Sequence, residues 1–149
     1  MPRNKIEIPC QVEHLSILDE TGQLDKGLEP EMGEELLLKL LRAMLLGRRF
    51  DERLLSLQRQ GRIGTFAPIT GQEASQLGAV AALRPSDWMA PSFREMAAEL
   101  WRGRTMESVI LSYGGYNEGA RADERGTTLP VSVPVGSQVL HAVGIAWAA

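Results

Sequence analysis

The chain has 149 residues, which is enough for one domain with a hydrophobic core. Its 16 basic and 19 acidic residues are mixed along the sequence and give a net charge of −3, which excludes a general binder of nucleic acid or of anionic membranes. The single cysteine, Cys10, excludes an internal disulfide and a cysteine-based metal cluster, and no uncharged apolar run approaches the ~20 residues of a membrane span. We therefore expect a cytoplasmic protein that binds neither nucleic acid nor membrane.

Residues 1–30 are predicted to form an N-terminal arm, with a short strand and a turn over 15–24. A long helix is predicted to follow, ending near Arg59. Pro30 suits the first turn of this helix, and leucines recur at helical spacing after it. Residues 31–149 are predicted to form one domain.

A turn-rich loop over 60–71 leads into a helix that we predict over 73–83. With its flanking residues, the loop reads RQGRIGTFAPITGQEA at 59–74. Such a loop presents backbone N–H groups and the positive end of a helix dipole, so it indicates an anion site of unspecified kind.

The rest of the chain alternates short helices with turns. The predicted elements are a short buried strand at 88–90, a helix at 93–101, a helix capped by Thr105 that ends near 113, a polar loop at 114–128, an extended stretch at 131–135 and a last helix from about 136. That last helix has no C-terminal glycine and no basic last turn. We therefore expect the chain to be a truncated piece of a longer protein.

No set of side chains in the sequence matches a familiar catalytic or metal-binding arrangement. There is no convincing Ser/His/Asp or Cys/His set, and neither HExxH nor CxxC spacing occurs. The sequence therefore assigns no catalytic residue and no metal ligand.

Three segments resemble, in order and at similar spacing, the alpha subunits of thiamine-diphosphate-dependent 2-oxo acid dehydrogenases, most closely those of the bacterial pyruvate (acetyl-transferring) type. They are the loop at 59–74, the sequence APSFRE at 90–95 and the sequence VPVGSQ at 133–138. The resemblance covers well over half of the chain. It implies the N-terminal part of a thiamine-diphosphate-binding α/β fold, mostly helical over these residues.

The same resemblance implies a set of cofactor-binding residues. Arg94 would offer its planar guanidinium to the diphosphate, and Phe93, where the family commonly has tyrosine, would wall the site. The carbonyl of Val133 and the N–H of Val135 would hydrogen-bond the aminopyrimidine ring, and Phe66 would lie near the reacting carbon and favour pyruvate. From the residues alone, Arg94 also fits an exposed first-turn arginine, and the two valines also fit the end of a core strand.

The implied activity is the oxidative decarboxylation of pyruvate with transfer of the acetyl unit to a lipoyl group, carried out by the intact alpha subunit and not by this fragment alone. The implied cofactors are thiamine diphosphate and magnesium. The family holds magnesium through a Gly-Asp-Gly motif, which does not occur here, so the metal ligands are expected outside this sequence. The implied partners are the beta subunit of the same enzyme and the lipoyl acyltransferase component, in an oligomer of the heterotetramer type.

Two kinds of alternative remain open. Within enzymes, the chain could belong to the alpha subunit of a branched-chain 2-oxo acid dehydrogenase or of an acetoin dehydrogenase. Outside enzymes, it could be a non-catalytic helical interaction domain.

Overall fold

A computed structural model describes residues 11–120 and 126–148. The chain divides into two compact units, Met1–Gly33 and Glu34–Ala149. The first ten residues of the predicted arm, Cys10 among them, and residues 121–125 of the predicted polar loop lie outside the described residues. The boundary expected at residue 30 stays a prediction.

A tight turn around Asp19 organises the described part of the first unit. The Asp19 carboxylate accepts hydrogen bonds from the hydroxyl of Thr21 (2.7 Å), the N–H of Thr21 (2.8 Å) and the N–H of Gln23 (2.8 Å). These bonds, the Thr21 hydroxyl first, lower the pKa of the Asp19 carboxyl. Leu18 and Leu24 pair across the turn as an isolated antiparallel bridge, so the predicted strand is present only as this bridge.

The second unit begins with the long predicted helix, α1 (Glu34–Arg59), which the structure confirms. Acidic side chains in its first turn and Arg59 in its last turn complement the helix dipole. Its buried face carries Phe50, Leu54 and Leu57. Gly47, also on this face, lies within a continuous helix. A Cβ there would already touch the Cβ of Ala97 at 3.4 Å, so the glycine allows close packing.

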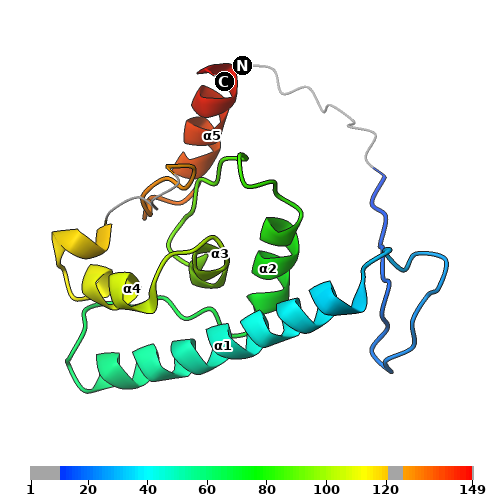
Figure 1. The fold of residues 1–149 in the computed structure, drawn as a ribbon, viewed down its shortest axis with the longest axis horizontal. Coiled ribbons are helices and arrows are strands. Elements are labelled where there is room, and N and C mark those ends of the chain that lie inside the picture. The colour runs from blue at the N-terminus through cyan, green and yellow to red at the C-terminus, as the bar shows by residue number, and fades with distance from the viewer. Residues whose placement is uncertain (1–10, 121–125, 149) are drawn as a thin grey trace, which may run out of the picture. The chain divides into compact units, whose positions relative to one another are not determined.

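Helices α2 (Glu73–Ala81) and α3 (Met96–Trp101) pack against each other and against α1 (Figure 1). Gln76 of α2 joins them, because its side-chain oxygen accepts from the N–H of Ala97 (3.1 Å) and its amide nitrogen donates to the carbonyl of Arg94 (2.6 Å). These bonds satisfy free backbone groups at the start of α3. The buried apolar side chains are Phe50, Leu54, Leu57, Ile63, Phe66, Ile69, Leu77, Val80, Met96, Ala97, Ala98 and Val109.

Helix α4 (Met106–Tyr113) confirms the predicted cap, since the Thr105 hydroxyl accepts from the N–H of Ser108 at 3.1 Å. A 3₁₀ helix, η1 (Asn117–Ala120), follows and packs on α4. A buried ion pair between Glu99 and Arg104 (2.6 Å) lies beside them, and Arg104 also donates to the carbonyl of Gly119 (2.9 Å). Burial raises the pKa of the Glu99 carboxyl, and Arg104 partly opposes that rise.

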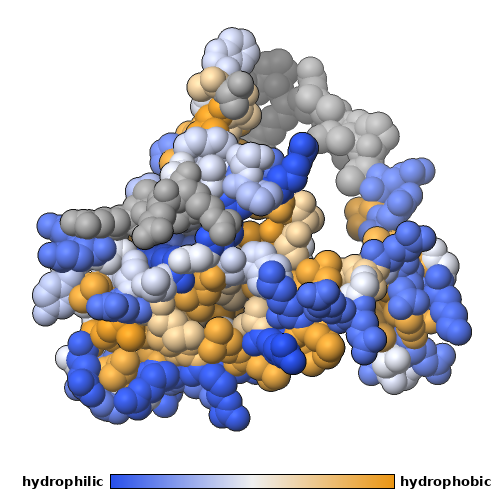
Figure 2. All heavy atoms as spheres, in the orientation of Figure 1, coloured by the Kyte–Doolittle hydropathy of each residue, from blue (hydrophilic) through white to orange (hydrophobic). Residues whose placement is uncertain are grey.

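The last helix, α5 (Ser137–Ala148), buries none of its side chains. It exposes Val139, Leu140, Val143 and Trp147. A second exposed apolar surface runs along α1, where Figure 2 shows hydrophobic residues at the surface. The exposed leucines of α1 are Leu37, Leu38, Leu41, Leu45 and Leu46.

The predicted mostly helical character is confirmed, whereas the β part of the predicted α/β class is not. Among the described residues, β pairing is confined to two isolated bridges, the one in the first unit and a parallel one between Met89 and Thr128. Pro91 stands where the next backbone donor of the parallel pair would lie, and proline has no N–H, so the pairing ends there. Within residues 11–120 and 126–148, no helix is both long enough and apolar enough to cross a membrane.

The packing of η1 on α4 predicts that Gly119→Ala is strongly destabilising. A Cβ at Gly119 would overlap backbone atoms of Ser108, Leu111 and Ser112, which cannot move without disturbing α4. Overpacking of this kind costs about 1–3 kcal/mol, and backbone overlap places this substitution at or above the upper end of that range. Urea unfolding followed by circular dichroism measures the loss.

The matched control is Gly78→Ala in α2, where a Cβ meets nothing within 4 Å. Alanine in a helix interior is more stable than glycine by about 1 kcal/mol, so this variant should gain stability. Equal stability of the Gly119→Ala variant and the wild type would contradict the packing described for η1.

Candidate functional site

The loop over residues 60–72 is held by a buried carboxylate of α1. Asp51 is only 1% exposed. Its two oxygens accept from the N–H of Ile69 (2.8 Å) and from the hydroxyl of Thr70 (2.7 Å). Because a buried charge is tolerated only when it is hydrogen-bonded, these contacts fix both Asp51 and the end of the loop.

A second acidic group, Glu73 at the start of α2, holds the same loop. Arg48 of α1 donates to both Glu73 oxygens, through Nε at 2.5 Å and Nη2 at 3.0 Å, and the N–H of Gly71 donates to the carboxylate at 3.0 Å. The Arg48 hydrogen bonds lower the pKa of Glu73, and in return the pKa of Arg48 is raised. Gly71 has φ +89°, which glycine adopts without strain.

The middle of the loop packs against the end of α4. The N–H of Gly64 donates to the carbonyl of Tyr113 at 2.8 Å. Phe66 is 4% exposed, and its ring meets the Tyr113 ring edge-on, with the centroids 5.2 Å apart. The structure therefore places Phe66 in the core, where it supports the loop. Its expected place near a reacting carbon stays a prediction.

Arg94 ties the second sequence segment to this loop. Its Nη1 donates to the carbonyl of Pro68 at 2.6 Å, and its guanidinium carbon lies 5.5 Å from the centroid of the Phe93 ring. A guanidinium has five N–H donors, and among the described residues only Pro68 accepts from this one. Arg94 is half-buried, and its remaining N–H donors are not used by the described residues.

The parallel bridge brings the third segment beside the second. The N–H of Met89 donates to the carbonyl of Thr127, and the N–H of Leu129 donates to the carbonyl of Met89, both at 2.9 Å. Two residues further on, the N–H of Ser132 reaches the carbonyl of Pro91 at 3.4 Å. The stretch that leads to Phe93 and Arg94 is thus paired with the stretch that leads to Val133 and Val135.

The third segment is shaped by Gln138 in the first turn of α5. The Gln138 side-chain amide donates to the carbonyls of Ser132 (2.6 Å) and Pro134 (3.3 Å), so both of these carbonyls face the helix start. Within the described part of the chain, the carbonyl of Val133 and the N–H of Val135 have no hydrogen-bond partner. Both valines are exposed. These two backbone groups are therefore available to a ligand.

The structure joins the first and second segments through Arg94, which the sequence singled out. Other residues that support the arrangement were not among the predicted site residues: Asp51 and Arg48 hold the first segment to α1, Arg102 links residues 87 and 127–128, and Gln138 shapes the third segment. One signal was available, since Asp51 is a charged residue on the apolar face that also carries Phe50 and Leu54. Arg48, Arg102 and Gln138 gave no such signal, because nothing in the sequence around them distinguishes them from exposed polar residues.

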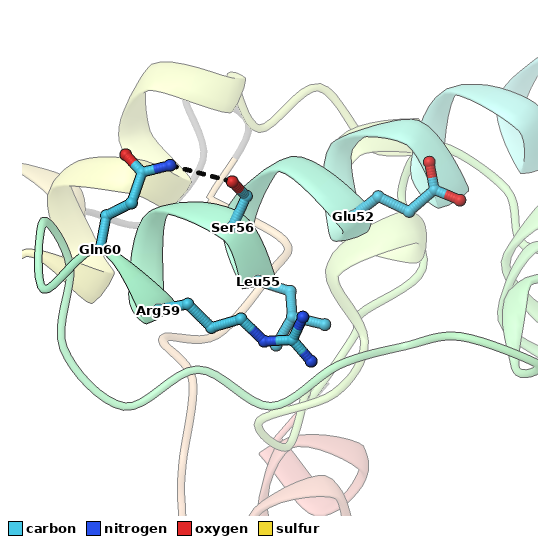
Figure 3. A pocket seen from close by; sticks show the side chains of 5 residues that line it. All are labelled: Glu52, Leu55, Ser56, Arg59 and Gln60. Atoms are coloured by element: carbon cyan, nitrogen blue, oxygen red, sulfur yellow. Dashed lines mark hydrogen bonds between the residues drawn. The ribbon is translucent and has the colours of Figure 1, made fainter.

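Two surface hollows lie outside this arrangement. The first, of about 380 Å³, is formed by the last turns of α1, where Figure 3 shows the side chains of Glu52, Leu55, Ser56, Arg59 and Gln60. The second, of about 390 Å³, lies between residues 86–90 and one face of α5. None of the predicted cofactor-binding side chains lines either hollow, and within the described ranges no three His, Cys, Asp or Glu side chains cluster as a metal site.

The chain belongs to the dehydrogenase E1 component family, which residues 41–149 match.

Similar proteins match most of the length of this chain. The pyruvate dehydrogenase E1 component subunit alpha of Acholeplasma laidlawii is 40% identical over 131 residues, which cover 87% of this chain and 38% of that protein. The proteins of the same name from Staphylococcus aureus and Bacillus cereus are 36% and 35% identical and cover 91% and 93% of this chain. The chain spans 37–38% of the length of these three relatives.

The Arg48–Glu73 pair predicts acid sensitivity of the loop. Because the folded pKa of Glu73 is lowered, its stabilising contribution is present above the unfolded value of about 4.3 and is lost as the pH falls through the folded pKa. Glu73→Gln should therefore be less stable than the wild type at pH 7, and the difference should shrink below about pH 4. Unfolding free energies of both proteins between pH 3 and pH 7 measure it, and a difference that stays constant over that range would contradict the assignment.

Proposed function

We propose that the chain forms part of the thiamine-diphosphate site of a pyruvate dehydrogenase E1 alpha subunit. The observation that carries the proposal is that hydrogen bonds join the three separate sequence segments. The carbonyl of Pro68 accepts a hydrogen bond from Arg94, and the carbonyl of Pro91 accepts one from the N–H of Ser132. The names of the similar proteins supply the activity.

The groups on this chain suit such a cofactor in two respects. A diphosphate carries several negative charges, and Arg94 has unused donors in a planar fork that matches phosphate oxygens. An aminopyrimidine ring has donors and acceptors on one edge, and the Val133 carbonyl with the Val135 N–H offers the complementary pair. Phe93 supplies an apolar ring beside the arginine.

When bound, thiamine diphosphate would supply the carbon nucleophile that allows a 2-oxo acid to lose carbon dioxide. The residues of this chain would bind and orient it. Arg94 would hold the phosphate end, while the backbone at Val133 and Val135 would fix the ring end. No side chain described here is proposed to move a proton.

The remaining parts of the proposal follow from the family. The fold is the N-terminal part of a thiamine-diphosphate-binding α/β domain, whose magnesium ligands lie outside these residues. The partners are a beta subunit and a lipoyl acyltransferase component, in the cytoplasm. The exposed apolar side chains of α1 and α5 support assembly, because large exposed apolar patches mark interaction surfaces.

Arg94→Ala in the complete enzyme, assembled with its beta subunit, should weaken thiamine diphosphate binding. Loss of a hydrogen bond to a charged group costs about 1.5–3 kcal/mol, which corresponds to roughly tenfold to over a hundredfold in affinity. Titration calorimetry with magnesium present measures the change. The control is Arg49→Ala on α1, which removes one charge from a side chain that is 83% exposed.

An Arg94→Ala enzyme with wild-type affinity would remove Arg94 from the site. If the complete wild-type protein, assembled with its beta subunit, does not bind the cofactor, the alternative function as a non-catalytic helical interaction domain is favoured.

The complete enzyme should also prefer pyruvate to 4-methyl-2-oxopentanoate. This expectation rests on the names of the similar proteins and not on Phe66, whose ring lies in the core of this structure. A pocket shaped for a methyl group disfavours the larger side chain by about 1–3 kcal/mol. Comparing kcat/KM for the two acids tests it. A preference for the branched acid would move the assignment to a branched-chain 2-oxo acid dehydrogenase.

A further inference from the structure

Arg102, the residue that follows α3, is a buried cation with only 5% of its surface exposed. Its Nη2 donates to the carbonyl of Asp87 at 2.8 Å and to the hydroxyl of Thr127 at 2.6 Å. Its Nε donates to the hydroxyl of Thr128 at 3.1 Å. One guanidinium thus holds two segments that are about forty residues apart in the chain.

These acceptors flank the parallel bridge at Met89. Asp87 lies two residues before Met89, and Thr127 and Thr128 are the residues to which Met89 is paired. An isolated bridge with two backbone hydrogen bonds is a weak constraint on its own, because no further strand lies beside it in the described residues. Arg102 adds three hydrogen bonds at the same place, and its donors are charged.

We infer that Arg102 is a positioning residue for the proposed cofactor site, holding residues 127–135 in register with residues 87–94. It would set where the backbone of Val133 and Val135 stands relative to Arg94, without touching the ligand itself. This inference rests on the proposed function. A guanidinium is required because lysine has a single nitrogen and cannot reach three separate acceptors in a fixed plane.

Arg104, two residues further on, provides a matched comparison. It is also a largely buried arginine, but it binds Glu99 and the carbonyl of Gly119 and so ties α3 to η1. It makes no hydrogen bond to residues 87–91 or 127–135. Replacing either arginine by glutamine removes the same charge from the same turn of the chain. Arg104→Gln also removes the ion-pair partner of the buried Glu99, so it is the more demanding control for a general loss of stability.

The first measurement needs no cofactor. Amide hydrogen exchange of the whole chain should show Leu129 and Met89, the two donors of the bridge, exchanging at least about tenfold faster in Arg102→Gln than in the wild type, because the clamp on that bridge is lost. In Arg104→Gln these two amides should exchange at the wild-type rate. Arg102→Lys should fall between Arg102→Gln and the wild type.

The second measurement is the affinity of the complete enzyme for thiamine diphosphate with magnesium present. Arg102→Gln should weaken it by roughly tenfold to a hundredfold, because small misplacements of binding groups have effects of this size. Arg104→Gln should stay within about twofold of the wild type, because it shares no partner with the site. Arg102→Lys should recover part of the affinity.

Faster exchange at Met89 and Leu129 together with wild-type cofactor affinity would overturn the inference, as would an equal loss of affinity in Arg104→Gln. Unchanged amide exchange at Met89 and Leu129 in Arg102→Gln would also overturn the inference, because it would show that Arg102 does not stabilise the bridge. A wild-type enzyme without affinity for the cofactor would instead overturn the proposed function, and the positioning role with it. The absence of wild-type affinity is distinguishable from a loss of affinity that occurs in Arg102→Gln alone.

Discussion

Two backbone hydrogen bonds at Met89 hold residues 127–129 against the segment that leads to Arg94, and the arrangement of the site depends on them. They are the only point among the described residues where the 88–94 and 127–133 stretches pair as β structure. Pro91 has no N–H and so prevents the pairing from extending, and one further hydrogen bond, from the N–H of Ser132 to the carbonyl of Pro91, links the segments beyond it. The pairing therefore aligns the two segments that lead to Arg94 and Val133.

Charged side chains fix the loop over residues 60–72 by hydrogen bonds to its backbone, beside the apolar packing of Ile63, Phe66 and Ile69 in the core. Asp51 and Glu73 accept hydrogen bonds from the backbone of residues 69–71, and Arg94 donates to the backbone at Pro68. The two buried carboxylates are hydrogen-bonded within the chain, which is the condition for burying them at tolerable cost. A loop held by directional bonds keeps one shape, and a binding site benefits because its groups are then positioned before the ligand arrives.

The helices could be predicted from the sequence to within a few residues because their signals are local. Leucine spacing, acidic first turns and the Thr105 cap act within one or two turns of the backbone. The contacts that join and shape the segments could not be predicted in this way. Arg102 binds residues that are distant in the sequence, and Gln138 binds carbonyls of the irregular stretch before α5, so neither contact leaves a repeating pattern in the sequence. The α/β expectation came from family resemblance, and the described residues contain only bridges because strands need neighbours to pair with. Phe66 shows the same limit, since its aromatic ring suits a pocket or a core equally well by sequence.

The most direct test is a crystal or cryo-electron microscopy structure of the complete enzyme with thiamine diphosphate and magnesium bound. We expect the Arg94 guanidinium to contact a diphosphate oxygen, and the Val133 carbonyl and the Val135 N–H to contact the aminopyrimidine ring. We also expect the hydrogen bonds at Met89 to persist in that structure. A cofactor bound away from residues 93–94 and 133–135, or a separation of the two segments at Met89, would contradict these expectations.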